Sequence, residues 1–251
     1  MCTPLVLSSS SLADGIHLSH MVIIGHRGAA GLKPENTLES FAAGVAAGAD
    51  MLEFDVRLTK DNIPVVMHDS HLIRTHQKVA TVRSLTFDDL VLKTKKSKHP
   101  ALKLETVLQQ FGGMIMFNIE LKDKGLAEII VPLIENNMKY IGDWESIVIS
   151  SFHVRELKHV RTLSTDAQLA LLQYMNPLKF VAFERQLRLS AVGFHRLHVN
   201  RLAVEIAKRL NIFTYVYTVN RPEAALRFEQ LGIDGLVTDF PDRMSELQEE
   251  A

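Results

Sequence analysis

The chain of 251 residues contains a single cysteine, Cys2. One cysteine allows neither a disulfide within the chain nor a cluster of thiolate metal ligands, so we expect a reducing, cytoplasmic environment. No run of about 18 apolar residues occurs, which argues against a membrane-spanning helix and against stable membrane insertion. The formal net charge of −1 offers no surplus of Lys and Arg to neutralise nucleic-acid phosphates. These absences favour a small molecule as the partner.

Positive charge gathers locally in one segment, residues 93–98, with the sequence KTKKSK. A run of lysines of this kind is typical of a solvated loop. A weak contact with an anionic partner is the alternative interpretation.

The chain is long enough, at 47% hydrophobic residues, to bury one large core. Residues 1–20 lack the basic start and the long apolar stretch of a signal peptide. We therefore expect residues 1–20 to be a poorly ordered extension and residues 21–251 to form a single domain that begins at Met21.

Three short apolar runs near the start of this domain each end in polar residues. Residues 22–25 lead into His26 and Arg27, residues 51–52 into Glu53 and Asp55, and residues 64–67 into His68. Charged groups at the ends of buried strands lose hydration, so they need a cation or an anionic ligand as partner.

Strand-like and helix-like segments alternate along the rest of the chain. The expected strands are 22–25, 51–58, 114–121, 146–151, 167–172, 191–195, 213–219 and 235–237, with 64–67 as an accessory strand. The expected helices are 38–48, 104–111, 126–136, 154–163, 178–185, 201–210 and 222–231, with a short amphipathic stretch at 85–92. Eight β/α units predict a closed (β/α)8 TIM barrel. An open doubly wound sheet is the alternative, but the Gly-rich phosphate turn that it needs does not follow the first strand.

Polar residues recur at the carboxyl ends of the expected strands, where a barrel builds its site. They are His26 and Arg27, Glu53 and Asp55, Glu120 and Lys122, Ser151 and His153, His195, Thr218 and Asn220, and Thr238 and Asp239. Carboxylates from separate strands suit a hard divalent cation, and Glu53, Asp55 and Glu120 are the best candidates. A solvated surface ladder on the strand is the alternative interpretation for Glu53 and Asp55.

Two histidines, His26 and His68, follow separate strands and could face each other across a substrate. One neutral and one protonated imidazole supply the base and the acid that a phosphodiester requires. Arg27 could contact the phosphoryl oxygens. Lys122 could do the same or could be a solvated lysine at a strand end.

Several ordered motifs resemble those of the glycerophosphodiester phosphodiesterase family. They are His26-Arg27-Gly28, Pro34-Glu35-Asn36-Thr37, Gly48-Ala49-Asp50, Glu53-Phe54-Asp55-Val56, Thr59-Lys60-Asp61, Pro64-Val65-Val66 and His68-Asp69, then Ile119-Glu120-Leu121-Lys122, Ser151-Phe152, Tyr217-Thr218-Val219-Asn220 and Asp234-Gly235-Leu236-Val237-Thr238-Asp239. The resemblance extends from Met21 to the C-terminus.

This resemblance implies a TIM barrel of the phospholipase C-like phosphodiesterase type that hydrolyses glycerophosphodiesters, such as glycerophosphocholine and glycerophosphoethanolamine, to sn-glycerol 3-phosphate and an alcohol. By motif match it implies one divalent metal ion, Mg²⁺ or Ca²⁺, on Glu53, Asp55 and Glu120, and an acid/base pair of His26 and His68. The same match implies that Arg27, Lys122, Tyr217 and Asn220 bind substrate. Attack by a glycerol hydroxyl, through a cyclic phosphate, and attack by water both remain open.

The sequence also departs from the family pattern. The family usually carries Trp where Tyr217 stands, and often Asp where Ile73 precedes Arg74. The segment between His68 and Glu120 leaves no room for a large inserted subdomain, so we expect an open mouth. Lysophospholipase D-like activity and a catalytically silent barrel that binds phosphodiesters are the alternative functions. A monomer and a homodimer fit the sequence equally.

Overall fold

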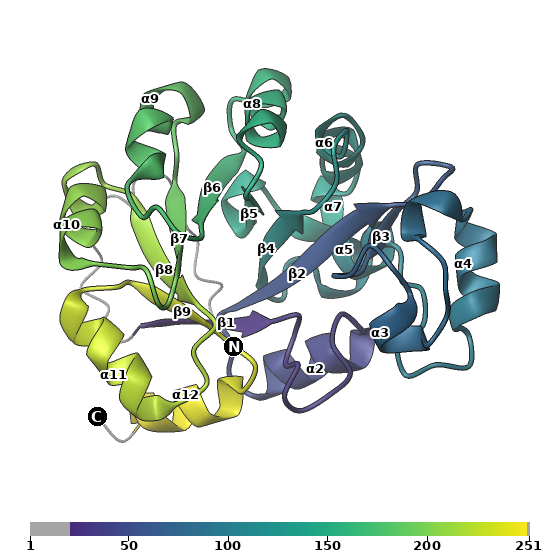
Figure 1. Ribbon diagram of the computed structural model, residues 1–251, viewed down its shortest axis with the longest axis horizontal. Coiled ribbons are helices and arrows are strands. Elements are labelled where there is room, and N and C mark those ends of the chain that lie inside the picture. The colour runs from purple at the N-terminus through teal and green to yellow at the C-terminus, as the bar shows by residue number, and fades with distance from the viewer. Residues whose placement is uncertain (1–20, 250–251) are drawn as a thin grey trace.

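Eight parallel strands form a closed barrel in the computed structural model, which describes residues 21–249 (Figure 1). The extension expected over residues 1–20 lies outside the described residues. The barrel strands are β1 (Val22–His26), β2 (Met51–Leu58), β4 (Met116–Leu121), β5 (Ile147–Ser151), β6 (Gln168–Gln173), β7 (Ala191–His195), β8 (Phe213–Tyr217) and β9 (Gly235–Thr238).

The first strand closes the barrel because it pairs on both of its edges. β1 pairs in parallel with β9 on one side and with β2 on the other. An open doubly wound sheet would leave two free edges instead. The structure therefore confirms the (β/α)8 prediction, including the accessory strand β3 (Pro64–Val66), which runs antiparallel to the end of β2.

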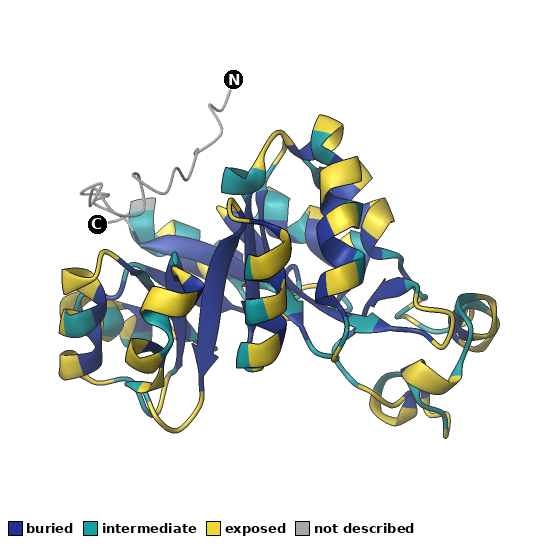
Figure 2. Ribbon diagram, turned by 90° about the horizontal axis from the view of Figure 1, so that it is seen from above, coloured by how far each residue is buried: buried dark blue, intermediate teal, exposed yellow. Residues whose placement is uncertain are grey.

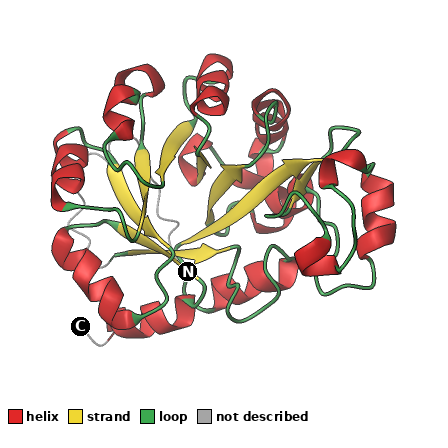
Figure 3. Ribbon diagram, in the orientation of Figure 1, coloured by secondary structure: helices red, strands yellow, loops and turns green. Residues whose placement is uncertain are grey.

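Helices form a ring outside the strands (Figures 1 and 3). They are α2 (Leu38–Ala46), α5 (Leu104–Phe111), α6 (Ala127–Asn136), α7 (Met138–Ile141), α8 (Val154–Leu163), α9 (Glu184–Leu187), α10 (Arg201–Arg209), α11 (Pro222–Leu231) and α12 (Pro241–Glu249). Local signals start them, because Thr37 and Asn200 cap α2 and α10 through their side chains and Pro222 opens α11. None of the helices of the described chain is long and apolar enough to cross a membrane.

The alternation along β2 separates two layers of packing. Leu52, Phe54 and Val56 point outward into the large core between the strands and the helices. Met51 points into the barrel, where a smaller apolar cluster fills the lower interior. Figure 2 shows the result, with buried strands inside and exposed faces on the outside of the helices.

A small lobe, residues 63–103, projects from the barrel beside the end of β2. We call it the rim lobe. It contains β3, α3 (Ile73–His76), a 3₁₀ turn (Val82–Ser84) and α4 (Phe87–Thr94). Five buried side chains give it a core of its own: Val65, Met67, Leu72, Val82 and Leu90. The lobe is attached at the carboxyl-terminal rim of the barrel, since Pro64 and Val66 pair with Leu58 and Val56.

Two differences from the expected elements have local causes. The helix expected over residues 178–185 is a 3₁₀ turn (Lys179–Ala182) followed by α9, because the backbone of Phe183 leaves the helical region at φ −120°. The terminal helix α12 was not predicted, because its sequence PDRMSELQE is mostly polar. Among its described side chains, Pro241 and Met244 are the buried ones.

Candidate active site

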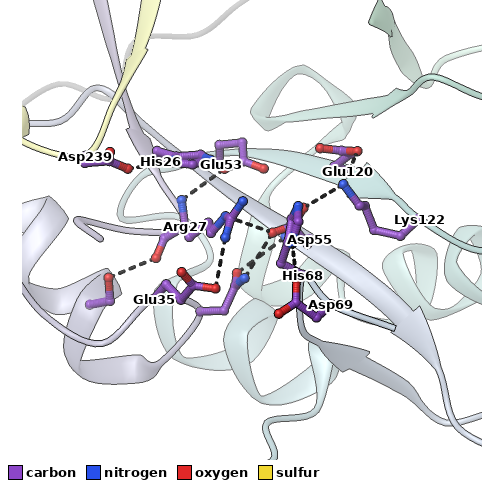
Figure 4. A network of polar contacts seen from close by, with 12 residues as sticks. His26, Arg27, Glu35, Glu53, Asp55, His68, Asp69, Glu120, Lys122 and Asp239 are labelled. Carbon is purple, nitrogen blue, oxygen red and sulfur yellow. Dashed lines mark hydrogen bonds and ion pairs between the residues drawn. The ribbon is translucent and has the colours of Figure 1, made fainter. Parts of the chain in front are cut away.

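The polar side chains that follow β1, β2, β4 and β9 converge at the carboxyl-terminal mouth of the barrel. His153, after β5, is exposed, and His195, at the end of β7, packs against Tyr174 and His198 instead. Figure 4 shows side chains from β1, β2 and β4 pointing toward one another, with His68 arriving from the segment after β3. Residues that are far apart in the sequence therefore share one site, as the strand-end pattern predicted. The ring of parallel strands produces this convergence because all eight carboxyl ends lie on the same side.

Three carboxylates form the centre of the site. Glu53, Asp55 and Glu120 each offer an oxygen, and these oxygens lie within 4.8 Å of one another. The strand register creates the cluster, because Asp55 on β2 lies beside Glu120 on β4. Asp55 is 1% exposed, so a solvated surface ladder is excluded for this residue. Three crowded oxygen donors could hold a divalent cation, which would offset their mutual repulsion.

The pKa values of the outer two carboxyls reflect this crowding. Burial, followed by the negative charge of Asp55, raises the pKa of Glu53 to about 7. The same two causes raise the pKa of Glu120 to about 7. A bound cation would favour the charged form of both groups, so the residues present fit a metal ion.

The central carboxylate, Asp55, is held by cations. Lys122 Nζ lies 3.3 Å from one of its oxygens, and Arg27 Nε lies 3.4 Å from the other. Asn36 Nδ2 donates to Asp55 at 3.0 Å. Burial alone would raise the pKa of Asp55, but Lys122 and Arg27 outweigh it and hold that pKa well below its usual range. Lys122 also lies 2.7 Å from Glu120, so it belongs to the site and is not a solvated lysine.

His26 is oriented by an acid from the last strand. Its Nδ1 lies 2.5 Å from Asp239, which follows β9, and its Nε2 lies 4.0 Å from Glu53. Burial would lower the pKa of His26, but the hydrogen bond with Asp239 and the charge of Glu53 raise that pKa above its ordinary value. Asn220 in turn fixes Asp239, because its Nδ2 donates to Asp239 at 2.6 Å and its Oδ1 accepts from the Asp239 backbone.

His68 is oriented by a different acid. Its Nδ1 lies 2.7 Å from Asp69, and Arg74 on α3 donates to the other oxygen of Asp69 at 2.6 Å. Arg74 also contacts Glu35, which accepts from Arg27 at 2.9 Å. Burial lowers the pKa of His68, and the nearby Arg27 adds to this effect. The two histidines therefore have pKa values shifted in opposite directions.

The turn after β1 brings its backbone close to the carboxylates. Arg27 has a positive φ of 50°, and its N–H donates to Glu53 at 2.9 Å. Gly28 follows at φ 92°, where a Cβ atom would lie 2.6 Å from the backbone of Ser40. Only glycine fits this contact with α2, which explains the Gly after His26 and Arg27.

An open cleft leads from this site into the barrel. His26, Glu53 and Glu120 line one part of it, and Phe152 and Tyr217 line another. The Tyr217 hydroxyl donates to the backbone of Gln173 at 2.6 Å, which fixes the ring at the cleft. A small molecule could therefore contact the carboxylates, a histidine and an aromatic surface together.

Four residues that support the site had no role assigned from the sequence: Glu35, Asp69, Arg74 and Asp239. Asp239 had a signal in the sequence, since it follows a strand like the other site residues. Glu35 and Asp69 lie within motifs that were noted without a role. Arg74 gave no signal, because its contacts depend on how the rim lobe packs against the barrel.

Comparisons with known proteins identify the family. The sequence profile described as the "Glycerophosphoryl diester phosphodiesterase family" matches residues 26–243. A glycerophosphodiester phosphodiesterase of Bacillus altitudinis is 31% identical over 253 residues, which cover 91% of this chain and 98% of that protein. The enzyme of the same name from Caldanaerobacter subterraneus subsp. tengcongensis is 29% identical over 244 residues, covering 90% and 97%.

A solved structure gives the same result for the fold. The crystal structure of a glycerophosphodiester phosphodiesterase from Thermotoga maritima superimposes with a TM-score of 0.77 and 26% identity. The match covers 92% of this chain and all of that chain (100%). With the profile match over most of its length, the chain belongs to the glycerophosphoryl diester phosphodiesterase family.

Proposed function

We propose that the chain hydrolyses glycerophosphodiesters, such as glycerophosphocholine and glycerophosphoethanolamine, to sn-glycerol 3-phosphate and an alcohol. The observation that carries the proposal is the convergence of three carboxylates and two histidines at one mouth (Figure 4). Family membership gives the reaction class, and the site supplies the groups that the reaction needs.

Glu53, Asp55 and Glu120 would hold one divalent metal ion. Their oxygens lie close enough to share an ion, and carboxylate oxygens suit Mg²⁺ and Ca²⁺ equally. When bound, the ion supplies positive charge that offsets the negative charge on the phosphoryl oxygens. Titration of the metal-free protein with each ion by calorimetry distinguishes Mg²⁺ from Ca²⁺.

Arg27 and Lys122 would bind the phosphate from opposite sides of Asp55. Arg27 Nε is buried and has no hydrogen-bond partner among the described residues, although it pairs electrostatically with Asp55. A buried N–H of this kind gains a partner when a phosphoryl oxygen arrives. Both side chains are already held in place by acids, so little ordering is needed when substrate binds.

His68 would act as the base and His26 as the acid. Burial lowers the pKa of His68, which keeps its imidazole neutral and able to accept the proton of the attacking hydroxyl. The pKa of His26 is raised, so its imidazolium can protonate the departing alkoxide as the phosphorus–oxygen bond breaks. Asp239 and Asp69 orient the two rings and stabilise their positive charge. These roles hold for attack by a glycerol hydroxyl and for attack by water.

Tyr217 and Asn220 were predicted to bind substrate. Tyr217 lines the cleft and can pack against the glycerol unit. The amide of Asn220 is engaged by Asp239 and Thr238, so we propose that Asn220 acts through Asp239.

An assay of glycerol 3-phosphate release from glycerophosphocholine tests the function, run with and without EDTA. We expect EDTA to abolish turnover and His26→Ala to lower kcat by about a hundredfold to ten-thousandfold. His159→Ala is the matched control, because His159 is an exposed histidine on α8. Full activity in His26→Ala, or in EDTA, would contradict the mechanism.

The same assay separates the alternative functions. Turnover of lysophosphatidylcholine with none of glycerophosphocholine would identify the lysophospholipase D-like activity. No turnover, together with no tight divalent site, would identify a silent binding barrel. For the wider setting we propose a cytoplasmic monomer or homodimer, which cell fractionation and light scattering would test.

A further inference from the structure

The rim lobe leaves three large apolar side chains in solvent. Val79 is 95% exposed, Leu92 62% and Ile73 55%. The lobe has a packed core of its own, and none of these three belongs to it. The core of the lobe is therefore complete without these three side chains. Exposed apolar side chains that form one patch mark a contact surface.

Five exposed lysines lie in the same lobe as these apolar residues. They are Lys78, Lys93, Lys95, Lys96 and Lys98. None of the five forms an ion pair with any residue in the described part of the chain. The lobe segment from residue 73 to residue 98 has two acids, Asp88 and Asp89, and both lie in the first turn of α4, away from the lysines at its end. The tip is thus strongly positive on a chain with a formal net charge of −1.

A hydrogen bond joins the two segments that carry these side chains. Lys78 Nζ donates to the backbone oxygen of Lys93 at 2.5 Å, which joins the loop after α3 to the end of α4. Val79 and Leu92 are the sequence neighbours of the two residues in this contact. We call the exposed surface of Lys78, Val79, Leu92, Lys93, Lys95, Lys96 and Lys98 the lobe tip.

The lobe tip projects from the same rim as the active site. Figures 1 and 2 show α4 at the end of the molecule farthest from α10 and α11, with exposed residues on its outer side. The lobe also reaches into the site through Arg74 on α3, which contacts Asp69 and Glu35. A surface that bound the lobe tip would therefore lie beside the mouth of the barrel.

We propose that the lobe tip docks on an anionic phospholipid membrane. Clustered lysines are attracted to the negative surface of such a membrane, and exposed apolar side chains enter the headgroup region beside them. Each feature alone binds weakly, and the two together give reversible binding without insertion of a helix. Val79 and Leu92 favour a lipid over a nucleic acid. The phosphates of a nucleic acid attract lysines but make no favourable contact with apolar side chains.

Vesicle co-sedimentation tests the proposal with the whole protein. We expect binding to vesicles of phosphatidylcholine with 30% phosphatidylglycerol at 50 mM NaCl, and no binding to pure phosphatidylcholine. Raising NaCl to 500 mM should release the protein, because salt screens the lysines. The variant K93Q/K95Q/K96Q/K98Q should weaken binding by at least about tenfold, and V79S/L92S should weaken it as well.

The matched control removes the same charge elsewhere. K139Q/K208Q/R209Q/R227Q changes four exposed cations on α7, α10 and α11 and should bind like the unaltered protein. Equal loss in this control, or no binding to anionic vesicles at 50 mM NaCl, overturns the proposal. Unchanged vesicle binding by V79S/L92S, with displacement by single-stranded DNA, would show a general polyanion contact and also overturns it.

The readout is independent of the proposed hydrolysis. Binding is measured without turnover, and the lobe-tip residues contact none of the proposed catalytic or metal-binding groups. K93Q/K95Q/K96Q/K98Q should therefore hydrolyse glycerophosphocholine, which is soluble, at the unaltered rate. Lost vesicle binding with normal turnover supports the docking surface, whereas a protein that binds vesicles but never turns over substrate contradicts only the proposed function.

Discussion

Arg74 Nε donates to one oxygen of Asp69 at 2.6 Å, and the other oxygen of Asp69 lies 2.7 Å from Nδ1 of His68. A side chain of the rim lobe thus holds the acid that orients a histidine of the site. The same guanidinium contacts Glu35, which holds Arg27. One lobe residue therefore supports both the proposed base and a proposed phosphate contact.

Replacing Arg74 should impair catalysis more than folding. We expect Arg74→Ala to lower kcat by about tenfold to a hundredfold, which is the usual effect of removing a group that orients an active-site side chain. KM should rise as well, since Glu35 would hold Arg27 less firmly. Steady-state kinetics on glycerophosphocholine measures both constants.

Two further variants control this experiment. Ile73→Ala changes an exposed neighbour on the same helix and should leave kcat unaltered. Arg74→Lys keeps the charge but cannot reach Asp69 and Glu35 together. Its kcat should therefore lie between that of Arg74→Ala and that of the unaltered protein. An Arg74→Ala protein with normal kcat would contradict the positioning role.

Asp239→Asn should change the pH dependence of the reaction. The hydrogen bond with Asp239 raises the pKa of His26, so a neutral amide at this position lets that pKa fall. If protonated His26 is the acid, activity is lost as pH rises through its pKa, and the alkaline limb of kcat/KM moves to lower pH. Asp166→Asn, at an exposed aspartate, should leave the profile in place. An unmoved alkaline limb in Asp239→Asn would exclude His26 as the acid.

The barrel could be predicted because its signals are local. The alternation in β2 separates Phe54 from Glu53 and Asp55, and a strand with one apolar face can adopt one register. The terminal helix α12 could not be found this way, because its buried residues among those described, Pro241 and Met244, are too few to leave a periodic pattern. The break between the 3₁₀ turn and α9, within residues 178–185, depends on backbone angles that the sequence does not show.

The centre of the site could be predicted, but its supports could not. Carboxylates and histidines at strand ends must meet once the barrel closes, so their convergence follows from the fold. The contacts of Asp239 and Arg74 depend on which loops pack against each other. His26 and Asp239, for example, are 213 positions apart in the sequence. No local sequence pattern predicts such a contact. The roles of the site residues stay predictions until variants are measured.

Phe54→Ala should destabilise the protein strongly. Phe54 is fully buried, and its ring centroid lies 5.3 Å from that of Phe41 and 5.6 Å from that of Phe117. Removing a buried phenyl ring leaves a cavity that costs about 3 to 5 kcal/mol of unfolding free energy. Urea unfolding followed by circular dichroism measures the loss. Leu226→Ala, at a partly exposed residue of α11, should change stability by less than about 1 kcal/mol, and an equal loss there would contradict the assignment.

Metal affinity should fall as pH falls from 8 to 6. Burial and the charge of Asp55 raise the pKa of both Glu53 and Glu120 to about 7, so protons compete with the ion in this range. If one proton must leave, the dissociation constant for Mg²⁺ rises about tenfold over these two units. Calorimetry in buffers of different ionisation enthalpy gives the affinity and counts the protons released.

The same carboxyls make the stability of the metal-free protein depend on pH. Their pKa is raised above the unfolded value of 4.5, so their contribution to stability is present below pH 4.5 and is lost as pH rises through about 7. Saturating metal should therefore raise the melting temperature more at pH 8 than at pH 6. Glu120→Gln removes one of the two groups and should release fewer protons and bind more weakly. Binding that releases no protons and does not vary with pH would show that the ion is held elsewhere.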